Sequence, residues 1–460
     1  MENRQYSYED IFLDIPVAFS HIKALKIEQC PNDHGKACLS GVLKDESYQG
    51  IHKLTRKTVV KIKAKKGAGE ETLFCGIPVG VTIRQERGVY EAEIKMKSVS
   101  FLMDVKKKNK SFQNKDKSYS WLFETLLQGY GGDVLDHASH GKLQGCALIQ
   151  YEETDWEFLK RAASRVGALV FPDVRFDIPK IFVGVPLGDL AAEAGKNHVI
   201  TKNEGKYLFL DRNFEDWMEQ DVLSCEFESR ENHGIGDRIT YEGASLIIAE
   251  KIMEMKGGIL IFQYGLRNEN GLKEHVIYHA RLKGTALKGT VLAARRDHLK
   301  LHLSIDKSQS PSEAAWYPFL TPYAAEGATG WYSMPEKGET VSLHFPTEKE
   351  EDAYVGTALR NKGEKNPKTR KSNVKYYGTE HGNELAFGPE RISISTRGNA
   401  LRMKLDEKSG IRIKSCQDIH LKAQQLSVSC GDVEIKSNEK IVIATPSSSM
   451  IIDDIVHIKG

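Results

Sequence analysis

The stretch Ile411-Arg-Ile-Lys-Ser-Cys-Gln-Asp-Ile-His-Leu-Lys-Ala-Gln-Gln-Leu-Ser-Val-Ser-Cys430 decides the fold class of the end of the chain. In it, a tetrad of the form apolar-x-apolar-polar recurs about every eight residues, and the same tetrad recurs from Ile392 to Lys459. Alternation with a period of two places the apolar side chains on one face of a strand. A strand this short buries little by itself, so the repeats predict a stack, either a β-solenoid or a fibre built with other chains. The tail therefore indicates a structural object before any catalyst.

Length and charge bound the class of protein. The 460 residues suffice for roughly three or four domains. Lys and Arg total 65 and Asp and Glu total 63, and this near balance argues against a nucleic-acid-binding protein. No apolar run approaches the roughly 20 residues that span a bilayer. The segment Met1–Gln5 does not begin an apolar signal-peptide core, so we expect synthesis and assembly in the cytoplasm.

Cysteine usage favours neither a disulfide framework nor a zinc cluster. The seven cysteines are odd in number and scattered, and no CxxC pair occurs. We interpret them as reduced, mostly buried thiols rather than metal or redox residues. They are Cys30, Cys38, Cys75, Cys146, Cys225, Cys416 and Cys430.

Upstream of the repeats, short alternating strands separated by glycine turns predict a mainly β protein. A segment with helical patterning interrupts them. In chain order, the expected parts are a β-barrel at 1–105, an α/β helical insertion at 106–175, a second β-barrel at 176–285, an OB-fold barrel at 286–360, a linker at 361–380 and the repeat segment at 381–460.

The first expected helix of the insertion spans Tyr119–Tyr130. Leu122 and Leu126 share a face with Tyr130, and two glycines follow. Before it, the lysines between Lys106 and Lys117 form a short basic segment. We interpret this segment as a solvated loop rather than a DNA-binding arm, because the chain as a whole is close to neutral.

The second expected helix begins at Thr154-Asp-Trp-Glu157, which fits a capping box. In that arrangement the Thr154 hydroxyl accepts from the Glu157 amide, and the Glu157 carboxylate accepts from the Thr154 amide. The apolar stripe is then formed by Trp156, Leu159, Ala163 and Val166, and Gly167 ends the helix. The nearby carboxylates, Glu152, Glu153, Asp155 and Glu157, resemble a catalytic cluster, but we favour caps and first-turn charges.

These parts, in this order, resemble VgrG proteins and phage tail hub–spike proteins. The resemblance is carried by Gln150-Tyr-Glu-Glu-Thr-Asp-Trp-Glu-Phe-Leu-Lys-Arg-Ala-Ala-Ser-Arg165, which includes Phe158 and Leu159 and is followed by Gly167. Ser111-Phe-Gln-Asn114 also resembles the family. The segment from Gly289 to Gly356, with Trp316-Tyr-Pro-Phe319 inside it, is similar to the OB domain of these spikes. The resemblance covers nearly the whole chain.

The resemblance implies a homotrimer. Its two barrels per chain would form a ring that meets the tail tube and baseplate, its OB barrels a collar, and its tails an intertwined, triple-stranded β-helix needle. Elementary physics agrees, because a lone chain leaves its apolar rows in water, and three chains can bury them on one axis. The residues expected on that axis are Ile411, Ile413, Ile419, Leu421, Leu426, Val428, Val433, Ile435, Ile441, Ile443, Val456 and Ile458.

We expect no enzyme activity, no cofactor and no nucleic-acid partner. The linker beginning at Asn361 cannot hold a two-carboxylate glycosidase site, and no nucleophile elbow, HExxH or P-loop occurs. Three copies of His457 could hold a metal at the tip, but the alternation of Val456-His-Ile-Lys459 turns His457 outward. Because Gly460 directly follows a repeat, we expect any cap or cargo to be a separate protein, such as a PAAR-like tip protein or an effector.

The leading hypothesis is a hub–spike of a contractile injection machine, such as a phage-like tail, a tailocin or a type VI-like secretion apparatus, delivered to a target cell envelope. The alternative from the enzyme class is a cell-wall or glycan hydrolase built on a β-helix, although such helices have coils of roughly 20 residues or more. An adhesin fibre is a third reading, which the absence of a binding head after the repeats disfavours.

Overall fold

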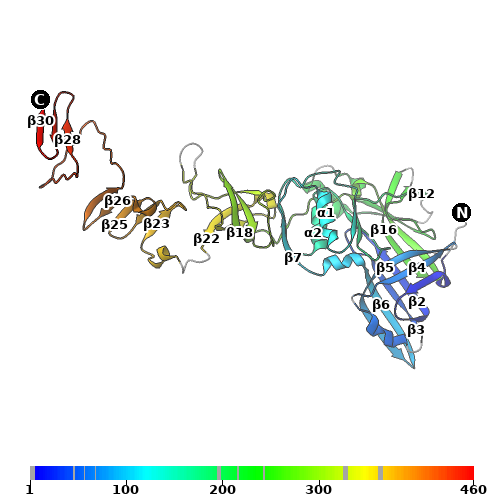
Figure 1. Ribbon diagram of the computed structural model, residues 1–460. Helices are drawn as coiled ribbons and strands as arrows, with labels where there is room; N and C mark the ends of the chain where they lie inside the picture. The colour runs from blue at the N-terminus through cyan, green and yellow to red at the C-terminus, as the bar shows by residue number, and fades with distance from the viewer. Residues whose placement is uncertain are drawn as a thin grey trace. The chain divides into compact units, whose positions relative to one another are not determined.

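The computed structural model describes residues 6–44, 47–55, 57–67, 69–193, 198–214, 217–241, 244–324, 330–360 and 366–459. The chain divides into two compact units, Met1–Asn361 and Lys362–Gly460. The first contains the hub strands, the helical insertion and the OB barrel, and the second contains the repeats (Figure 1). The fold is mainly β, as the sequence predicts.

The hub strands form one 12-stranded sheet in the order β1-β4-β5-β6-β3-β2-β16-β17-β14-β13, to which β15 and β12 are attached through β16. The two segments predicted to be separate barrels are therefore joined, because β2 pairs antiparallel with β16 and places Lys26 opposite Glu254. The strands are β1 (Ile11–Asp14), β2 (Phe19–Gln29), β3 (Lys36–Leu43), β4 (Val60–Lys66), β5 (Gly69–Glu86), β6 (Val89–Ser98), β12 (Leu190–Glu193), β13 (His198–Lys202), β14 (Leu223–Ser229), β15 (Arg238–Tyr241), β16 (Ala244–Lys256) and β17 (Ile259–Arg267).

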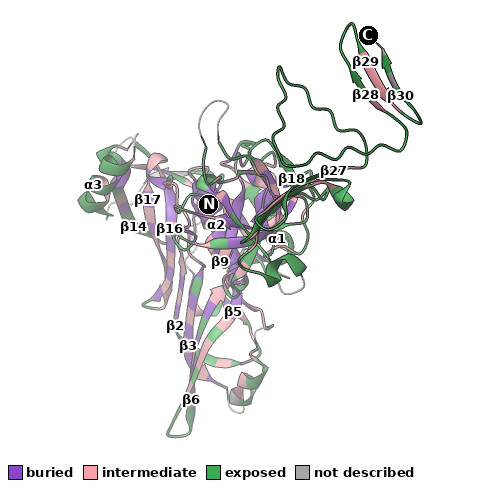
Figure 2. Ribbon diagram, turned by 90° about the vertical axis from the view of Figure 1, so that its left-hand side faces the viewer, coloured by how far each residue is buried: buried purple, intermediate pink, exposed green. Residues whose placement is uncertain are grey.

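The hairpin β16–β17 shows how the sequence specifies this sheet. Its turn is Gly257-Gly258, with φ of 58° and 86°, values that suit a two-residue hairpin turn. Inward-facing side chains alternate along both strands. One of the two predicted arms starts at Ser245, and the strand continues to Lys256 past a bulge between Ile248 and Glu250, at which the register with β17 shifts. The hub core lies along β2, β3, β5 and β16 (Figure 2).

Both predicted helices of the insertion are present. They are α1 (Tyr119–Gln128) and α2 (Asp155–Ser164). The insertion extends beyond its predicted end at residue 175, because the sheet β10-β11-β8 pairs strands on both sides of that boundary. The basic segment is also not simply a loop, because β7 lies within it and pairs with β9. The strands are β7 (Lys108–Phe112), β8 (Asp133–Asp136), β9 (Leu148–Glu153), β10 (Val170–Asp173) and β11 (Lys180–Val183).

The third part is a five-stranded OB barrel with the order β20-β19-β18-β21-β22. A parallel bridge between Phe319 and Val355 closes it, as expected for this barrel type. Leu301 and Val341 are among the fully buried residues of its core. The strands are β18 (Ala286–Arg295), β19 (His298–Leu303), β20 (Trp316–Pro318), β21 (Thr340–His344) and β22 (Tyr354–Leu359).

In the described residues, the second unit holds two antiparallel sheets. The intertwined β-helix of three chains stays a prediction, because the structure contains one chain. Residues 416–440, which contain three of the expected repeats, form no strand. The strand β23 lies inside the segment assigned to the linker, of which 361–365 are outside the described residues. The strands are β23 (Lys375–Gly378), β24 (Glu384–Phe387), β25 (Arg391–Ser395), β26 (Leu401–Asp406), β27 (Gly410–Ser415), β28 (Ile441–Ala444), β29 (Ser449–Ile452) and β30 (Val456–Lys459).

The apolar rows of this unit are exposed (Figure 2). In β27, Ile411 is 67% exposed and Ile413 is 59% exposed. The physical reason is that a single-layer sheet has no second layer to cover either face, so alternation alone buries nothing.

The remaining elements are short apart from α3 (Glu204–Asn213), which the sequence did not predict and whose N-cap is Asn203. The 3-10 turns are η1 (Tyr8–Asp10), η2 (Ser47–Lys53), η3 (Val99–Asp104), η4 (Glu219–Val222), η5 (Asn270–Leu272), η6 (Glu350–Asp352), η8 (Pro367–Arg370) and η9 (Arg397–Asn399). Within the residues that the structure describes, no helix combines the length and apolar character needed to cross a membrane.

The cysteines are free thiols, but most are not buried, contrary to the prediction. Cys75 and Cys225 are buried, whereas Cys416 and Cys430 in the second unit are exposed. Cys416 and Cys430 lie beside repeats that have no apolar core to pack on in the single chain. Residue type alone therefore did not predict their exposure. Burial raises the pKa of the Cys75 thiol to about 11, which makes it a poor nucleophile at neutral pH.

Candidate functional site

The start of α2 has the predicted capping box. The Thr154 hydroxyl accepts from the Glu157 amide at 3.1 Å, and the Glu157 carboxylate accepts from the Thr154 amide at 2.9 Å. The Thr154 hydroxyl also donates to Asp104 in η3, at 2.6 Å. The cap therefore fixes the start of α2 and ties it to the end of the first hub segment.

Asp155 does more than the predicted first-turn charge. Its side chain is 4% exposed and accepts hydrogen bonds from three groups. Gln150 donates at 2.9 Å and Tyr130 at 2.6 Å, and Lys108 forms an ion pair with the same carboxylate. These contacts hold α2 against β7, β9 and the end of α1. The carboxylate is therefore engaged in contacts that position α2.

Trp156 connects the insertion to the hub sheet. It is 2% exposed and its ring lies 4.2 Å from the ring of His34, in the loop between β2 and β3. His34 also contacts Ser100, with 2.9 Å between Nδ1 and the hydroxyl oxygen. Burial lowers the pKa of His34 to about 4, so the imidazole is neutral at physiological pH and packs as an aromatic group.

A buried ion cluster joins α2 to the OB barrel. Arg161 donates from Nε and Nη2 to both oxygens of Glu153, each at 2.9 Å, and from Nη1 to Glu350 in η6. Arg165 donates to the second oxygen of Glu350 at 2.6 Å. The side chains of Arg161 and Glu350 are 4% and 1% exposed. Bidentate geometry and mutual pairing offset the large cost of desolvating these charges.

A second set of contacts joins the same two parts from β7. The Ser111 amide donates to Asp306 of the OB barrel at 2.8 Å, and the Ser111 hydroxyl donates to the same carboxylate. Gln113 donates to the Leu301 carbonyl at 3.2 Å and accepts from the Ala315 amide at 3.2 Å. The Ser111-Phe-Gln-Asn114 element, singled out in the sequence, therefore fastens the insertion to the barrel.

One strand contributes side chains to the apolar cores on both sides of this junction. Ala147 and Ile149, at the start of β9, belong to the buried cluster of the OB barrel, whereas Leu148 between them belongs to the cluster of the insertion. Alternation along β9 thus places its two faces in two cores. The hub insertion and the OB barrel are consequently one mechanical body rather than two domains on a flexible hinge. We refer to this region as the junction.

Other residues of the predicted motif have structural roles in α2. Phe158 stacks on Phe112 with ring centroids 5.3 Å apart, and Leu159 is fully buried. Gly167 ends the helix with φ of 71°, a left-handed conformation that glycine adopts without strain. Sequence reasoning missed Arg161 and Glu350. A signal for Arg161 existed, because it lies on the apolar side of α2, one turn from Phe158.

The residues predicted for the needle axis belong to the second unit. All are exposed in the single chain except Ile441, which is partly buried. The side chain of His457, named above as a possible metal ligand, lies outside what the structure describes. Among the described residues, no group of three or more His, Cys, Asp or Glu gathers as a metal site would require.

The fold of this chain is similar to that of VgrG-like hub–spike proteins. The chain superposes on an Escherichia coli protein, c3393, described as a component of the type VI secretion system with structural similarity to the T4 bacteriophage tail proteins gp27 and gp5. That match has a TM-score of 0.52 at 13% identity and covers 76% of this chain and 99% of the other.

Complexes of Francisella PdpA and VgrG are also similar. The half-lidded complex matches with a TM-score of 0.56 at 10% identity, covering 89% of this chain and 88% of the other. A lidless PdpA–VgrG complex matches with a TM-score of 0.56 at 11% identity, covering 89% and 98%. These matches show, at low sequence identity, a fold similar to that of the VgrG structures.

Comparison by sequence adds little to this. A family described as the Alg8 N-terminal domain matches residues 54–183, which is less than half of the chain. That range includes only β4, β5 and β6 of the hub sheet, and it ends with β11 in the insertion. It therefore does not coincide with a structural unit. No curated protein matches the sequence.

Proposed function

We propose that this protein is the homotrimeric hub–spike at the tip of a contractile injection machine, where it joins the tail tube and baseplate to a piercing needle. The junction is the observation that supports this role most strongly. A spike tip must pass a compressive load from the hub to the needle without bending. A strand that contributes to both cores and a buried ion cluster support that stiffness between the insertion and the OB barrel.

We assign the load-bearing parts as follows. The hub strands meet the tube and baseplate proteins, the OB barrels of three chains form the collar, and residues from about 381 onward form the needle. The exposed rows in the second unit support the last assignment, because such apolar surface needs partner chains to cover it. With one strand spacing of about 4.8 Å per repeat, the needle would be on the order of 40 Å long.

At the needle end we propose a separate cap or cargo, either a PAAR-like tip protein or an effector. The Francisella relatives were solved as complexes of VgrG with PdpA. By analogy, the machine assembles in the cytoplasm and delivers this protein toward a target cell envelope. In this proposal the protein itself is structural and carries no catalytic or metal site.

Native mass spectrometry tests the assembly. We expect a particle of about three times the 51.6 kDa mass of the chain. Electron microscopy should show a three-fold ring bearing a thin stalk. A stable monomer at micromolar concentration would contradict the proposal. The competing assignment, a cell-wall hydrolase, is tested by incubating the same sample with peptidoglycan, from which we expect no release of soluble fragments.

A further inference from the structure

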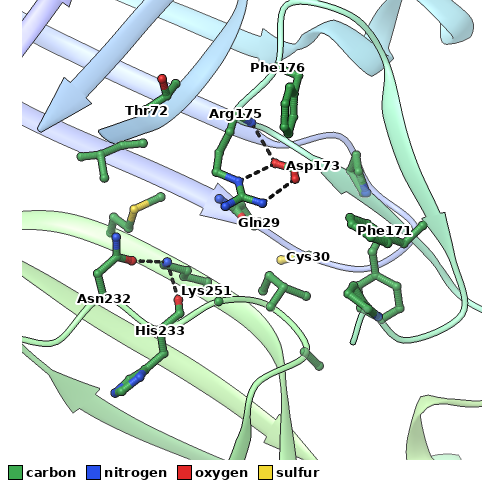
Figure 3. Close-up of a pocket in the computed structure, with 18 of the residues that line it drawn as sticks. Gln29, Cys30, Thr72, Phe171, Asp173, Arg175, Phe176, Asn232, His233 and Lys251 are labelled. Atoms are coloured by element: carbon green, nitrogen blue, oxygen red, sulfur yellow. Dashed lines mark hydrogen bonds and ion pairs between the residues drawn. The ribbon is translucent and has the colours of Figure 1, made fainter. Parts of the chain in front are cut away.

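A cavity of about 530 Å³ opens between the hub sheet and the segment that follows β10 (Figure 3). Its volume is in the range of small-molecule sites, roughly 300 to 1,000 Å³. Its lining includes the apolar residues Phe171, Phe182, Pro186, Ile235 and Met253. All these residues belong to the first unit, so the cavity is complete within one chain.

Lys251 on β16 forms the polar floor of the cavity. It lies between Ala249 and Met253 in the inward-facing row of the strand and is 7% exposed. Its ammonium donates to the Asn232 side-chain oxygen and, at 2.5 Å, to the His233 carbonyl. A lysine has three N–H donors, so these acceptors leave one donor for the cavity.

The acceptors are themselves held in place. The Tyr264 hydroxyl accepts from the His233 amide and donates to the Glu231 carbonyl, both at 2.7 Å. Tyr264 is 1% exposed and lies opposite Lys251 across the β16–β17 pair. The turn that presents Asn232 and His233 is therefore part of a fixed, preorganised site rather than a loose loop.

Among the described residues, no carboxylate lies within ion-pair distance of Lys251. The two nearby acids of the cavity are engaged elsewhere. Glu71 accepts from Tyr6 and, at 3.2 Å, from Asn232. Asp173 pairs with Arg175, which donates to both of its oxygens at 2.9 and 2.7 Å. A buried cation without a counter-charge is costly, and burial lowers the pKa of Lys251 to about 7.

The mouth of the cavity adds a second cation next to an aromatic ring. The Arg175 side chain is 61% exposed, and Phe176 beside it is 38% exposed. Asp173 orients the Arg175 guanidinium but leaves part of its donor fork unused. Figure 3 shows Arg175 and Lys251 on opposite sides of the opening, with Cys30 between the polar groups and Phe171.

We propose that this cavity binds a carboxylate carried on an apolar body. The carboxylate provides the counter-charge for Lys251 and accepts its remaining N–H, and the apolar body packs on Phe171, Phe182 and Met253. A single negative charge fits better than a phosphate dianion, because Glu71 and Asp173 lie nearby and would repel a second charge. The ligand is either a free organic acid or an acidic side chain next to an apolar residue in a protein segment.

Isothermal titration calorimetry on the full-length protein at pH 6.5 tests the proposal. The probes are phenylacetate, hexanoate and the peptide acetyl-Phe-Asp-amide, each compared with its neutral amide. We expect at least one acid to bind at least ~10-fold more tightly than its amide, the discrimination expected of a hydrogen bond to a charged group. Binding of phenylacetate or hexanoate alone identifies a free acid as the ligand, and binding of the peptide alone identifies a protein segment.

Two variants connect the binding to the named residues. Lys251→Met should weaken binding of the acid at least ~10-fold. It should leave the fold intact, because it replaces a buried cation that has no carboxylate partner with an apolar side chain of similar length. Arg175→Gln at the mouth should weaken binding by a smaller factor. Lys256→Met is the matched control on the same strand, since Lys256 is exposed and pairs with Glu228 outside the cavity.

The proposal is overturned if no acid binds better than its amide, or if Lys251→Met binds as the parent protein does. Circular dichroism of each variant verifies folding, so a loss of binding in a folded Lys251→Met protein supports the site. This test is independent of the proposed hub–spike role, because the cavity lies within a single chain and the calorimetry does not depend on assembly.

Discussion

Arg161 and Glu350 form an ion pair between α2 and the OB barrel although 189 positions separate them in the chain. Both side chains are almost completely buried. The pair converts an N-terminal hub and a following barrel into one body, and the same helix also carries Trp156 toward the hub sheet. The single helix α2 therefore contacts both the OB barrel and the hub segment.

Removing the acid of this pair should weaken the junction strongly. Glu350→Ala leaves Arg161 and Arg165 as buried, uncompensated charges, and we expect a loss of about 3–5 kcal/mol. Chemical denaturation followed by tryptophan fluorescence should show the loss as an earlier first transition. Glu351→Ala is the matched control, because Glu351 is 43% exposed and lies 3.6 Å from Arg165. Its effect should stay below about 1 kcal/mol, and equal effects of the two variants would contradict a buried cluster.

The cap of α2 offers a smaller, local test. Thr154→Ala removes the acceptor for the Glu157 amide and the bond to Asp104, and should cost roughly 1–2 kcal/mol. Thr154→Ser keeps the hydroxyl and should recover most of that loss. Amide hydrogen exchange over α2 measures the difference directly. Unchanged protection in Thr154→Ala would show that packing of Trp156 and Leu159 alone holds the helix start.

Lys251 predicts an unusual pH dependence of stability. Its folded-state pKa of about 7 lies below the ordinary value of 10.5, so between these pH values the unfolded chain binds more protons than the folded chain. The free energy of unfolding should therefore rise through this window by up to several kcal/mol, at about 1.4 kcal/mol per pKa unit. The increase is lost as pH falls from 10.5 to about 7, and below about 7 the contribution of Lys251 no longer changes with pH. Lys251→Met should flatten the profile, and parallel profiles for parent and variant would rule out this origin.

Adjacent positions in the repeats should differ sharply in their effect on assembly. Leu421→Asp places a charge in the apolar row proposed for the needle axis, and should reduce the trimer to monomer or unravel the stalk. His420→Asp introduces the same residue at the next position, on the opposite face of the proposed strand. It should leave the trimer intact in native mass spectrometry. Loss of the trimer in both variants, or in neither, would argue against the proposed axis.

Local features of this fold could be predicted from the sequence. The capping box at Thr154, the glycine after α2 and the five strands of the OB barrel each leave a signal within a few residues. The joining of the two hub segments could not be predicted, because the pairing of Lys26 with Glu254 brings together strands that no local pattern links. Strand pairing is a property of the whole chain.

For the candidate sites, too, the sequence indicated some residues but not their partners. Ser111 and Gln113 were selected by resemblance, but their partners Asp306 and Leu301 become visible only in three dimensions. Lys251 did leave a signal, since it interrupts an inward-facing row with a charge. A lysine at such a position can also point its ammonium out to solvent, so the sequence alone did not distinguish a buried cation from an exposed one.

The strand β9 sets the boundary for any chimaera made from this protein. A swap that begins at residue 286 would take the OB barrel but leave Ala147 and Ile149 behind, and these side chains complete its core. The transplanted barrel would then carry an uncovered apolar face. The donor hub would expose Ala147 and Ile149, which pack against the barrel in the intact chain. An exchangeable cassette must include β9 with the barrel, or the recipient must supply a strand whose outward face matches it.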